Sequence, residues 1–159
     1  MKTSLLTVVV LLQMMSRALA GECRERLEPL LASEQPKATV ALFEVCQVAA
    51  AAGDGEALYW VSFFYFGLLE STPDERRGVE SVAASAETGY AHAQYWMGWQ
   101  SEIGEWLPQD AAAAIAWYEK AADSNHWLAL ERLSRAYRNG ELGLEPDAER
   151  AEQYAARRR

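Results

Sequence analysis

The sequence predicts an all-α protein built from repeated helix pairs, and a fixed internal period is the main observation behind that prediction. The pattern Ala-x-x-Gly-x-x-x-Ala begins at Ala50 and again at Ala86, and it returns at Ala122 with Asn125 in the glycine's place. Each copy begins 36 residues after the previous one, a period typical of helical repeat arrays. No stretch alternates apolar and polar residues for long enough to predict a strand.

Prolines, glycines and capping residues divide the chain into about four expected helix pairs. Asp74, Asp110 and Asp147 each stand where a helix is expected to begin, and an aspartate there accepts hydrogen bonds from free backbone N–H groups. Gly53 and Gly89 follow expected helix ends, where a left-handed residue is favoured. The expected helices pair as 22–33 with 37–52, 54–68 with 74–88, 90–103 with 110–124, and 126–139 with 147–157.

Residues 1–20 are expected to be a cleaved secretory signal peptide. Lys2 supplies a positive charge, Leu5–Met15 is an apolar run, and Ala18-Leu19-Ala20 is a small-x-small cleavage site. The apolar run is shorter than the roughly 20 residues that span a bilayer. We therefore expect a periplasmic mature chain that begins at Gly21 and does not insert into the membrane.

The charge of the chain argues against nucleic acid as a partner. The formal net charge is −8, and removing Lys2 and Arg17 with the signal peptide makes it −10. Phosphate backbones and anionic membrane surfaces are bound by basic faces, which this composition does not favour.

The two cysteines, Cys23 and Cys46, are predicted to form a disulfide, as an even cysteine count in an exported chain suggests. They are nearly equidistant from the turn expected near Gln35, so an antiparallel hairpin over 21–52 would bring them face to face. A redox or metal-binding pair is the alternative. The chain has no Cys-x-x-Cys, and two cysteines with His92 and His126 lack the spacing of a zinc site. We expect neither metal nor cofactor.

The third helix pair carries a family motif. It reads Gly89-Tyr-Ala-His-Ala-Gln-Tyr-Trp-Met-Gly98, then Gly104, Asp110, Ala114 and Trp117-Tyr-Glu-Lys-Ala-Ala122. This resembles the Sel1-like repeat, a relative of the tetratricopeptide repeat. The resemblance covers 53–156 well and 22–52 weakly, and it implies three repeats at about 53–88, 89–124 and 125–157. It also implies a right-handed solenoid of antiparallel helices, protein–protein interaction as the usual activity, and no catalytic residues.

The first helices of the second, third and fourth pairs carry a second stripe opposite their expected core stripe, aromatic in the second and third pairs and containing two arginines in the fourth. A solvated helix is polar on that side. Two interpretations stay open: a concave surface that binds a partner protein, since aromatic residues and arginine are enriched at binding hot spots, or tight packing that buries Trp60 and Trp96 as core. The predicted partner-binding residues are Trp60, Phe63, Phe64, Trp96, Trp99, Arg132 and Arg135.

The predicted function is binding of another protein by an exported, non-enzymatic repeat protein. One use is a periplasmic immunity protein that blocks a secreted effector. An alternative is an envelope scaffold or adaptor of a motor, polysaccharide or secretion complex. A hydrolase acting on cell-wall material is a further alternative, although the chain contains no Gly-x-Ser-x-Gly, no His-Glu-x-x-His and no phosphate-binding loop.

Overall fold

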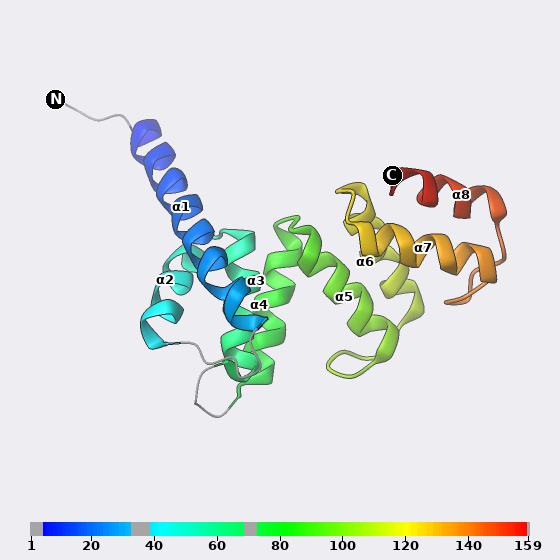
Figure 1. The fold of residues 1–159 in the computed structure, drawn as a ribbon, viewed down its shortest axis with the longest axis horizontal. Coiled ribbons are helices and arrows are strands. Elements are labelled where there is room, and N and C mark those ends of the chain that lie inside the picture. The colour runs from blue at the N-terminus through cyan, green and yellow to red at the C-terminus, as the bar shows by residue number, and fades with distance from the viewer. Residues whose placement is uncertain (1–4, 33–38, 69–72, 159) are drawn as a thin grey trace. The chain divides into compact units, whose positions relative to one another are not determined.

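The computed structural model describes residues 5–32, 39–68 and 73–158, and its regular structure there is entirely helical. Figure 1 shows the helices in chain order from blue to red. Among the described residues, no helix combines the length and the apolar character needed to cross a membrane. The prediction of an all-α chain without a sheet is therefore confirmed for the described ranges.

The chain divides into two compact units, Met1–Thr88 and Gly89–Arg159. In the N-terminal unit α1 packs against α2 and α3, and α3 against α4; in the C-terminal unit each helix packs against the next. The N-terminal unit contains α1 (Leu5–Leu31), α2 (Val40–Ala51), α3 (Gly55–Phe63), the π-helical turn η1 (Phe64–Leu68) and α4 (Glu75–Glu87). The C-terminal unit contains α5 (Ala91–Ile103), α6 (Ala111–Asp123), α7 (Trp127–Asn139) and α8 (Ala148–Arg157).

The N-terminal helices differ in extent from the sequence prediction. Helix α1 begins at Leu5 instead of residue 22, so it runs without a break through the predicted signal peptide and its cleavage point. Ala20, the last residue before that point, is buried in the core of the unit. Helix α2 begins at Val40 instead of residue 37, because the Thr39 hydroxyl accepts a hydrogen bond from the Leu42 N–H at 3.2 Å and caps the helix there. The turn expected near Gln35 lies outside the described residues.

The expected capping residues occupy their places. The carboxylates of Asp74, Asp110 and Asp147 each accept a hydrogen bond from the backbone N–H three residues further on, at 2.9 to 3.0 Å. Gly53, Gly89 and Asn125 all adopt positive φ, with values of 82°, 94° and 57°. The repeated glycine and its asparagine substitute are thus explained by one backbone requirement, a left-handed residue after a helix.

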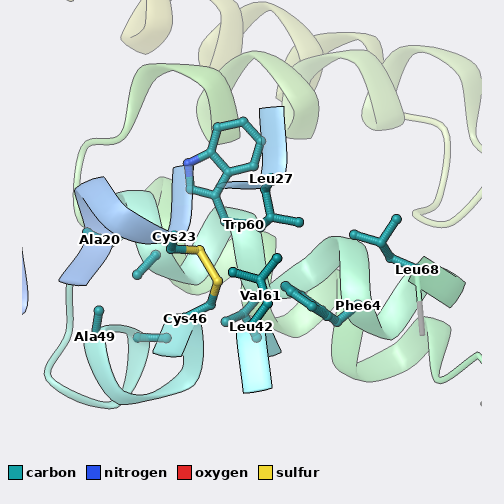
Figure 2. Close-up of a cluster of buried hydrophobic side chains, with 12 residues drawn as sticks. Ala20, Cys23, Leu27, Leu42, Cys46, Ala49, Trp60, Val61, Phe64 and Leu68 are labelled. Carbon is teal, nitrogen blue, oxygen red and sulfur yellow. A yellow bond between two sulfur atoms is a disulfide. The ribbon is translucent and has the colours of Figure 1, made fainter. Parts of the chain in front are cut away.

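The predicted disulfide is confirmed in the N-terminal unit. Cys23 of α1 and Cys46 of α2 are bonded, with Cα atoms 5.1 Å apart and both side chains fully buried. Figure 2 shows the bond among the side chains of the surrounding core. That core is formed by Ala20, Cys23, Leu27, Leu42, Cys46, Ala49, Ala50, Ala57, Trp60, Val61, Phe64 and Leu68.

The core of the C-terminal unit is built around small residues. Five of its nine buried members are alanines, which let helices approach closely. Gly98 shows how close: a Cβ atom there would lie 2.7 Å from Cδ1 of Tyr118, so α5 and α6 leave no room for a larger side chain. The buried set is Ala114, Tyr118, Ala121, Ala122, Ala129, Leu130, Leu133, Tyr137 and Ala151.

Candidate partner-binding surface

The three predicted binding residues of the N-terminal unit belong to its core. Trp60 is 7% exposed and Phe64 is 2% exposed, while the half-buried Phe63 packs against the same cluster. The Trp60 indole N–H donates to Glu56 at 3.4 Å, so the polar atom of this buried ring has a partner. For Trp60 and Phe64 the structure therefore favours the packing interpretation that the sequence had left open.

The aromatic residues of α5 divide into a stacked one and an exposed one. Trp96 is half-buried and stacks on Trp106 of the following turn, with ring centroids 5.6 Å apart and an interplanar angle of 22°. Trp99 is 41% exposed and Ile103 is 43% exposed. These two lie four residues apart on α5 and so share one face of the helix. Partner binding by Trp99 remains a prediction, and Ile103 extends the same apolar surface.

The two arginines of α7 have different environments. Arg132 is 9% exposed and makes a bidentate ion pair with Glu102 of α5, at 2.7 Å from Nη2 and 2.9 Å from Nε. Its remaining terminal nitrogen lies 2.6 Å from Glu141, which follows α7. Arg135 is exposed, and its Nε lies 3.5 Å from Glu141. Arg132 is thus a buried structural cation, whereas Arg135 faces solvent.

Glu102 is the centre of a polar network that joins α5, α6 and α7. The Tyr118 hydroxyl of α6 donates to Glu102 at 2.8 Å, alongside the two bonds from Arg132. Burial raises the pKa of Glu102, but the hydrogen bonds from Arg132 and Tyr118 outweigh burial and hold this pKa below its ordinary value. Burial and the bond to Glu102 raise the pKa of Tyr118. The carboxylate therefore stays ionised and the phenol neutral over the physiological range.

The two histidines, His92 of α5 and His126 at the start of α7, are in contact. His126 Nε2 and His92 Nδ1 lie 2.9 Å apart, and the His126 ring stacks on Tyr95 with centroids 4.9 Å apart. Burial, followed by the proximity of His92, lowers the pKa of His126 to about 4. His126 is therefore neutral at physiological pH, and its contact with His92 joins α5 to the start of α7.

The histidine pair is poorly suited to a metal ion. Coordination through His126 Nε2 would put the proton on Nδ1, which is buried and has no hydrogen-bond partner. Metal-binding histidines almost always donate that second N–H to an acceptor. Within the described residues, no group of three or more histidine, cysteine, aspartate or glutamate side chains is arranged to hold a metal ion.

Sequence analysis missed the network of Glu102, Arg132 and Glu141, although one signal pointed to it. Arg132 occupies the repeat position of Trp60 and Trp96, two and one periods earlier. A charged residue at a position otherwise filled by a large aromatic requires a partner if that position is buried. The nearest acidic candidate on the neighbouring first helix is Glu102, which lies 30 residues earlier in the chain.

Comparison with known proteins assigns the C-terminal unit to a repeat family. The Sel1 repeat model matches residues 91–126 and 127–157. Residues 91–157 are therefore two Sel1-like repeats. The matched repeats begin about two residues later than the predicted boundaries and comprise α5 with α6 and α7 with α8.

Two solved structures extend the likeness beyond the matched repeats. The Sel1 repeat protein from Oxalobacter formigenes is 25% identical, with a TM-score of 0.72 over 86% of this chain and 56% of its own. A protective antigen of uropathogenic Escherichia coli strains, which displays the SLR fold, is 29% identical, with a TM-score of 0.65 over 73% of this chain and 25% of its own. The chain thus spans about half of one of these proteins and a quarter of the other.

These similarities confirm the predicted fold class, an all-α solenoid of Sel1-like helix pairs. The fold is that of a protein–protein interaction module. No curated protein matches the sequence.

Proposed function

We propose that this Sel1-like repeat protein binds a partner protein through one surface of its C-terminal unit, the α5–α7 face, formed by Trp99, Ile103 and Arg135 and held together by the buried ion pair of Arg132 with Glu102. The observation that supports it best is the exposure of Trp99 and Ile103 side by side on α5, at 41% and 43%. Exposed apolar side chains that adjoin one another and are bordered by charge are typical of interaction sites.

The α5–α7 face is a continuous surface because an ion pair connects its two helices. Glu102 of α5 is bonded to Arg132 of α7. On α5, Trp99 lies three residues before Glu102, and on α7, Arg135 lies three residues after Arg132. Residues three apart on a helix are surface neighbours. Trp99 and Arg135 also occupy the same repeat position, 36 residues apart. A tryptophan and an arginine on one rigid surface form a suitable hot spot.

We further propose that binding takes place in the periplasm, after residues 1–20 have been removed, and that the protein acts there as an immunity protein against a secreted effector. The charged start, apolar run and Ala18-Leu19-Ala20 site support export. The buried Cys23–Cys46 disulfide supports an oxidising compartment. Mass spectrometry of the protein isolated from cells should find Gly21 at the N-terminus, and an intact Met1 would contradict export.

The test of partner binding is a pull-down from periplasmic extract, followed by affinity measurements on the captured protein. Trp99→Ala should weaken binding by about 2 kcal/mol or more, the size of a hot spot. Trp127→Ala is the matched control, because Trp127 is 56% exposed but stands at the first residue of α7, away from the C-terminal half that carries Arg135.

The outcomes separate the possible roles. Normal binding by Trp99→Ala would refute the α5–α7 face as the binding surface. Capture of a toxic effector whose activity the protein blocks supports immunity. Capture of an envelope assembly component would instead make it a scaffold, and release of fragments from purified cell wall would make it a hydrolase.

A further inference from the structure

Arg135 is the cation of the α5–α7 face that is available to a ligand. Its Nε lies 3.5 Å from Glu141, outside the range of about 2.7 to 3.2 Å for a good hydrogen bond. Glu141 has two closer donors, Arg132 at 2.6 Å and the Asn139 amide at 2.9 Å. Glu141 therefore keeps its bonds if Arg135 turns to another carboxylate.

The other arginines of α7 are already committed. Arg132 uses Nε and both terminal nitrogens on Glu102 and Glu141. Arg138 donates to the Ser134 hydroxyl, which itself donates to the Ala151 carbonyl of α8. Arg138 is thus directed toward α8, and among the described arginines of α7, Arg135 is the exposed one on the α5–α7 face, held only by a long ion pair with Nε 3.5 Å from Glu141.

The exposed apolar side chains of α5 on this face are Trp99 and Ile103. Glu102 lies between them in the sequence of α5, and its carboxylate is bonded to Arg132 and Tyr118. Arg132 therefore offsets the negative charge of Glu102, which reduces the repulsion of an incoming anion. An exposed tryptophan and isoleucine on the same face as an exposed guanidinium match a ligand that is apolar over part of its length and carries one negative charge.

We infer that the α5–α7 face recognises a segment of the partner protein in which an apolar side chain packs on Trp99 and Ile103 and a nearby aspartate or glutamate pairs with Arg135. This inference rests on the proposed function and adds the chemistry of the partner. The whole chain has a net charge of −8. The partner's carboxylate is thus a local feature matched to a single arginine, since a broadly acidic partner would be repelled at long range.

The inference can be tested without the natural partner, by selecting random twelve-residue peptides displayed on phage against the full folded chain. Selected peptides should share an aromatic or aliphatic residue within a few positions of an aspartate or glutamate. Arg135→Gln should weaken their binding about tenfold, the size expected for a charge-assisted pair at a partly exposed site. Arg138→Gln should leave it unchanged. Arg135→Glu should shift a new selection toward lysine and arginine.

The variants distinguish failure of this inference from failure of the proposed function. Selected peptides without acidic residues, or equal binding by Arg135→Gln, would overturn the carboxylate pairing. If Trp99→Ala still weakened those peptides, the α5–α7 face would stand with a different partner chemistry. If no peptide were enriched, or if Trp99→Ala had no effect, both the face and its chemistry would be refuted.

Discussion

One repeat position is filled differently in the two units of the molecule. In the N-terminal unit the position holds Trp60, a ring 7% exposed in an apolar core that also encloses a disulfide. In the C-terminal unit it holds the half-buried Trp96 and then, 72 residues after Trp60, Arg132, which is 9% exposed and bonded to Glu102 and Glu141. The same helical framework thus accepts a large apolar side chain or a buried cation.

The helical framework thus fixes where a side chain lies but leaves open how that side chain is stabilised. Trp60 needs only volume and apolar neighbours, a non-directional requirement. Arg132 needs carboxylates at defined positions, because a buried charge without a partner is strongly destabilising. The N-terminal unit therefore depends on packing and a covalent link, and the C-terminal unit on close alanine packing and a directed polar network.

The largest expected loss of stability should follow truncation of the buried Trp60 in the N-terminal unit. Trp60→Ala should lower the free energy of unfolding of the N-terminal unit by roughly 3 to 5 kcal/mol, because truncation leaves a cavity in the core. Trp99→Ala is the matched control, and since Trp99 is 41% exposed its cost should be well below that. Chemical denaturation followed by circular dichroism measures both. Equal losses for the two variants would contradict the assignment of Trp60 to the core and Trp99 to the surface.

The disulfide should give the next largest effect. Replacing Cys23 and Cys46 together by serine should destabilise the N-terminal unit by about 3 kcal/mol, mainly because the unfolded chain gains freedom. Hydrogen exchange measured by mass spectrometry should show lost protection in α1, α2 and α3. Peptides from residues 91–157 are the internal control and should exchange as before. Loss of protection across both units would show that the disulfide stabilises the whole chain.

The polar network should respond to loss of Arg132. Arg132→Met should destabilise the C-terminal unit by about 2 to 3 kcal/mol, because Glu102 would remain partly buried without its main partner. Arg135→Met, one turn away on the exposed side, should change stability by less than about 0.5 kcal/mol. Hydrogen exchange in α5 and α7 measures the difference. Unchanged protection in Arg132→Met would mean that the network contributes nothing net to stability.

The histidine pair should make the C-terminal unit sensitive to mild acid. Because the folded pKa of His126 is about 4, below its ordinary 6.5, the unfolded chain binds a proton that the folded chain excludes. The stability that neutral His126 contributes to the folded state is fully present above pH 6.5 and is lost as the pH falls toward 4. Between pH 7 and 5 the loss should reach about 2 kcal/mol, at about 1.4 kcal/mol for each pH unit below 6.5.

The control for this acid sensitivity is His126→Phe, which keeps an aromatic ring against Tyr95 and removes the titrating group. Its stability should change little over the same range. Glu102, whose folded pKa is lowered from 4.5, adds stability that is lost only below pH 4.5. An identical pH slope in wild type and His126→Phe would contradict the prediction.

Much of the fold could be predicted because its signals are local. The repeat period, the aspartate caps and the left-handed residues Gly53, Gly89 and Asn125 act within one or two helical turns. Cys23 and Cys46 lie in helices that follow one another along the chain, so their spacing sufficed to predict the bond. The extent of α1 was not predicted, because a signal-peptide pattern marks processing and does not interrupt helical structure.

The helical period, the caps, the disulfide and the stripe of large side chains on the first helices could all be predicted from the sequence. Which members of that stripe are buried depends on how the helices pack: Trp60, Phe64 and Arg132 lie inside, and Trp99 and Arg135 lie outside. The packing of the helices also brings Glu102 to Arg132 and His92 to His126, across 30 and 34 residues. Local backbone preferences depend on residues that are adjacent in the sequence. Burial and charge pairing depend instead on side chains that come together only when the helices pack.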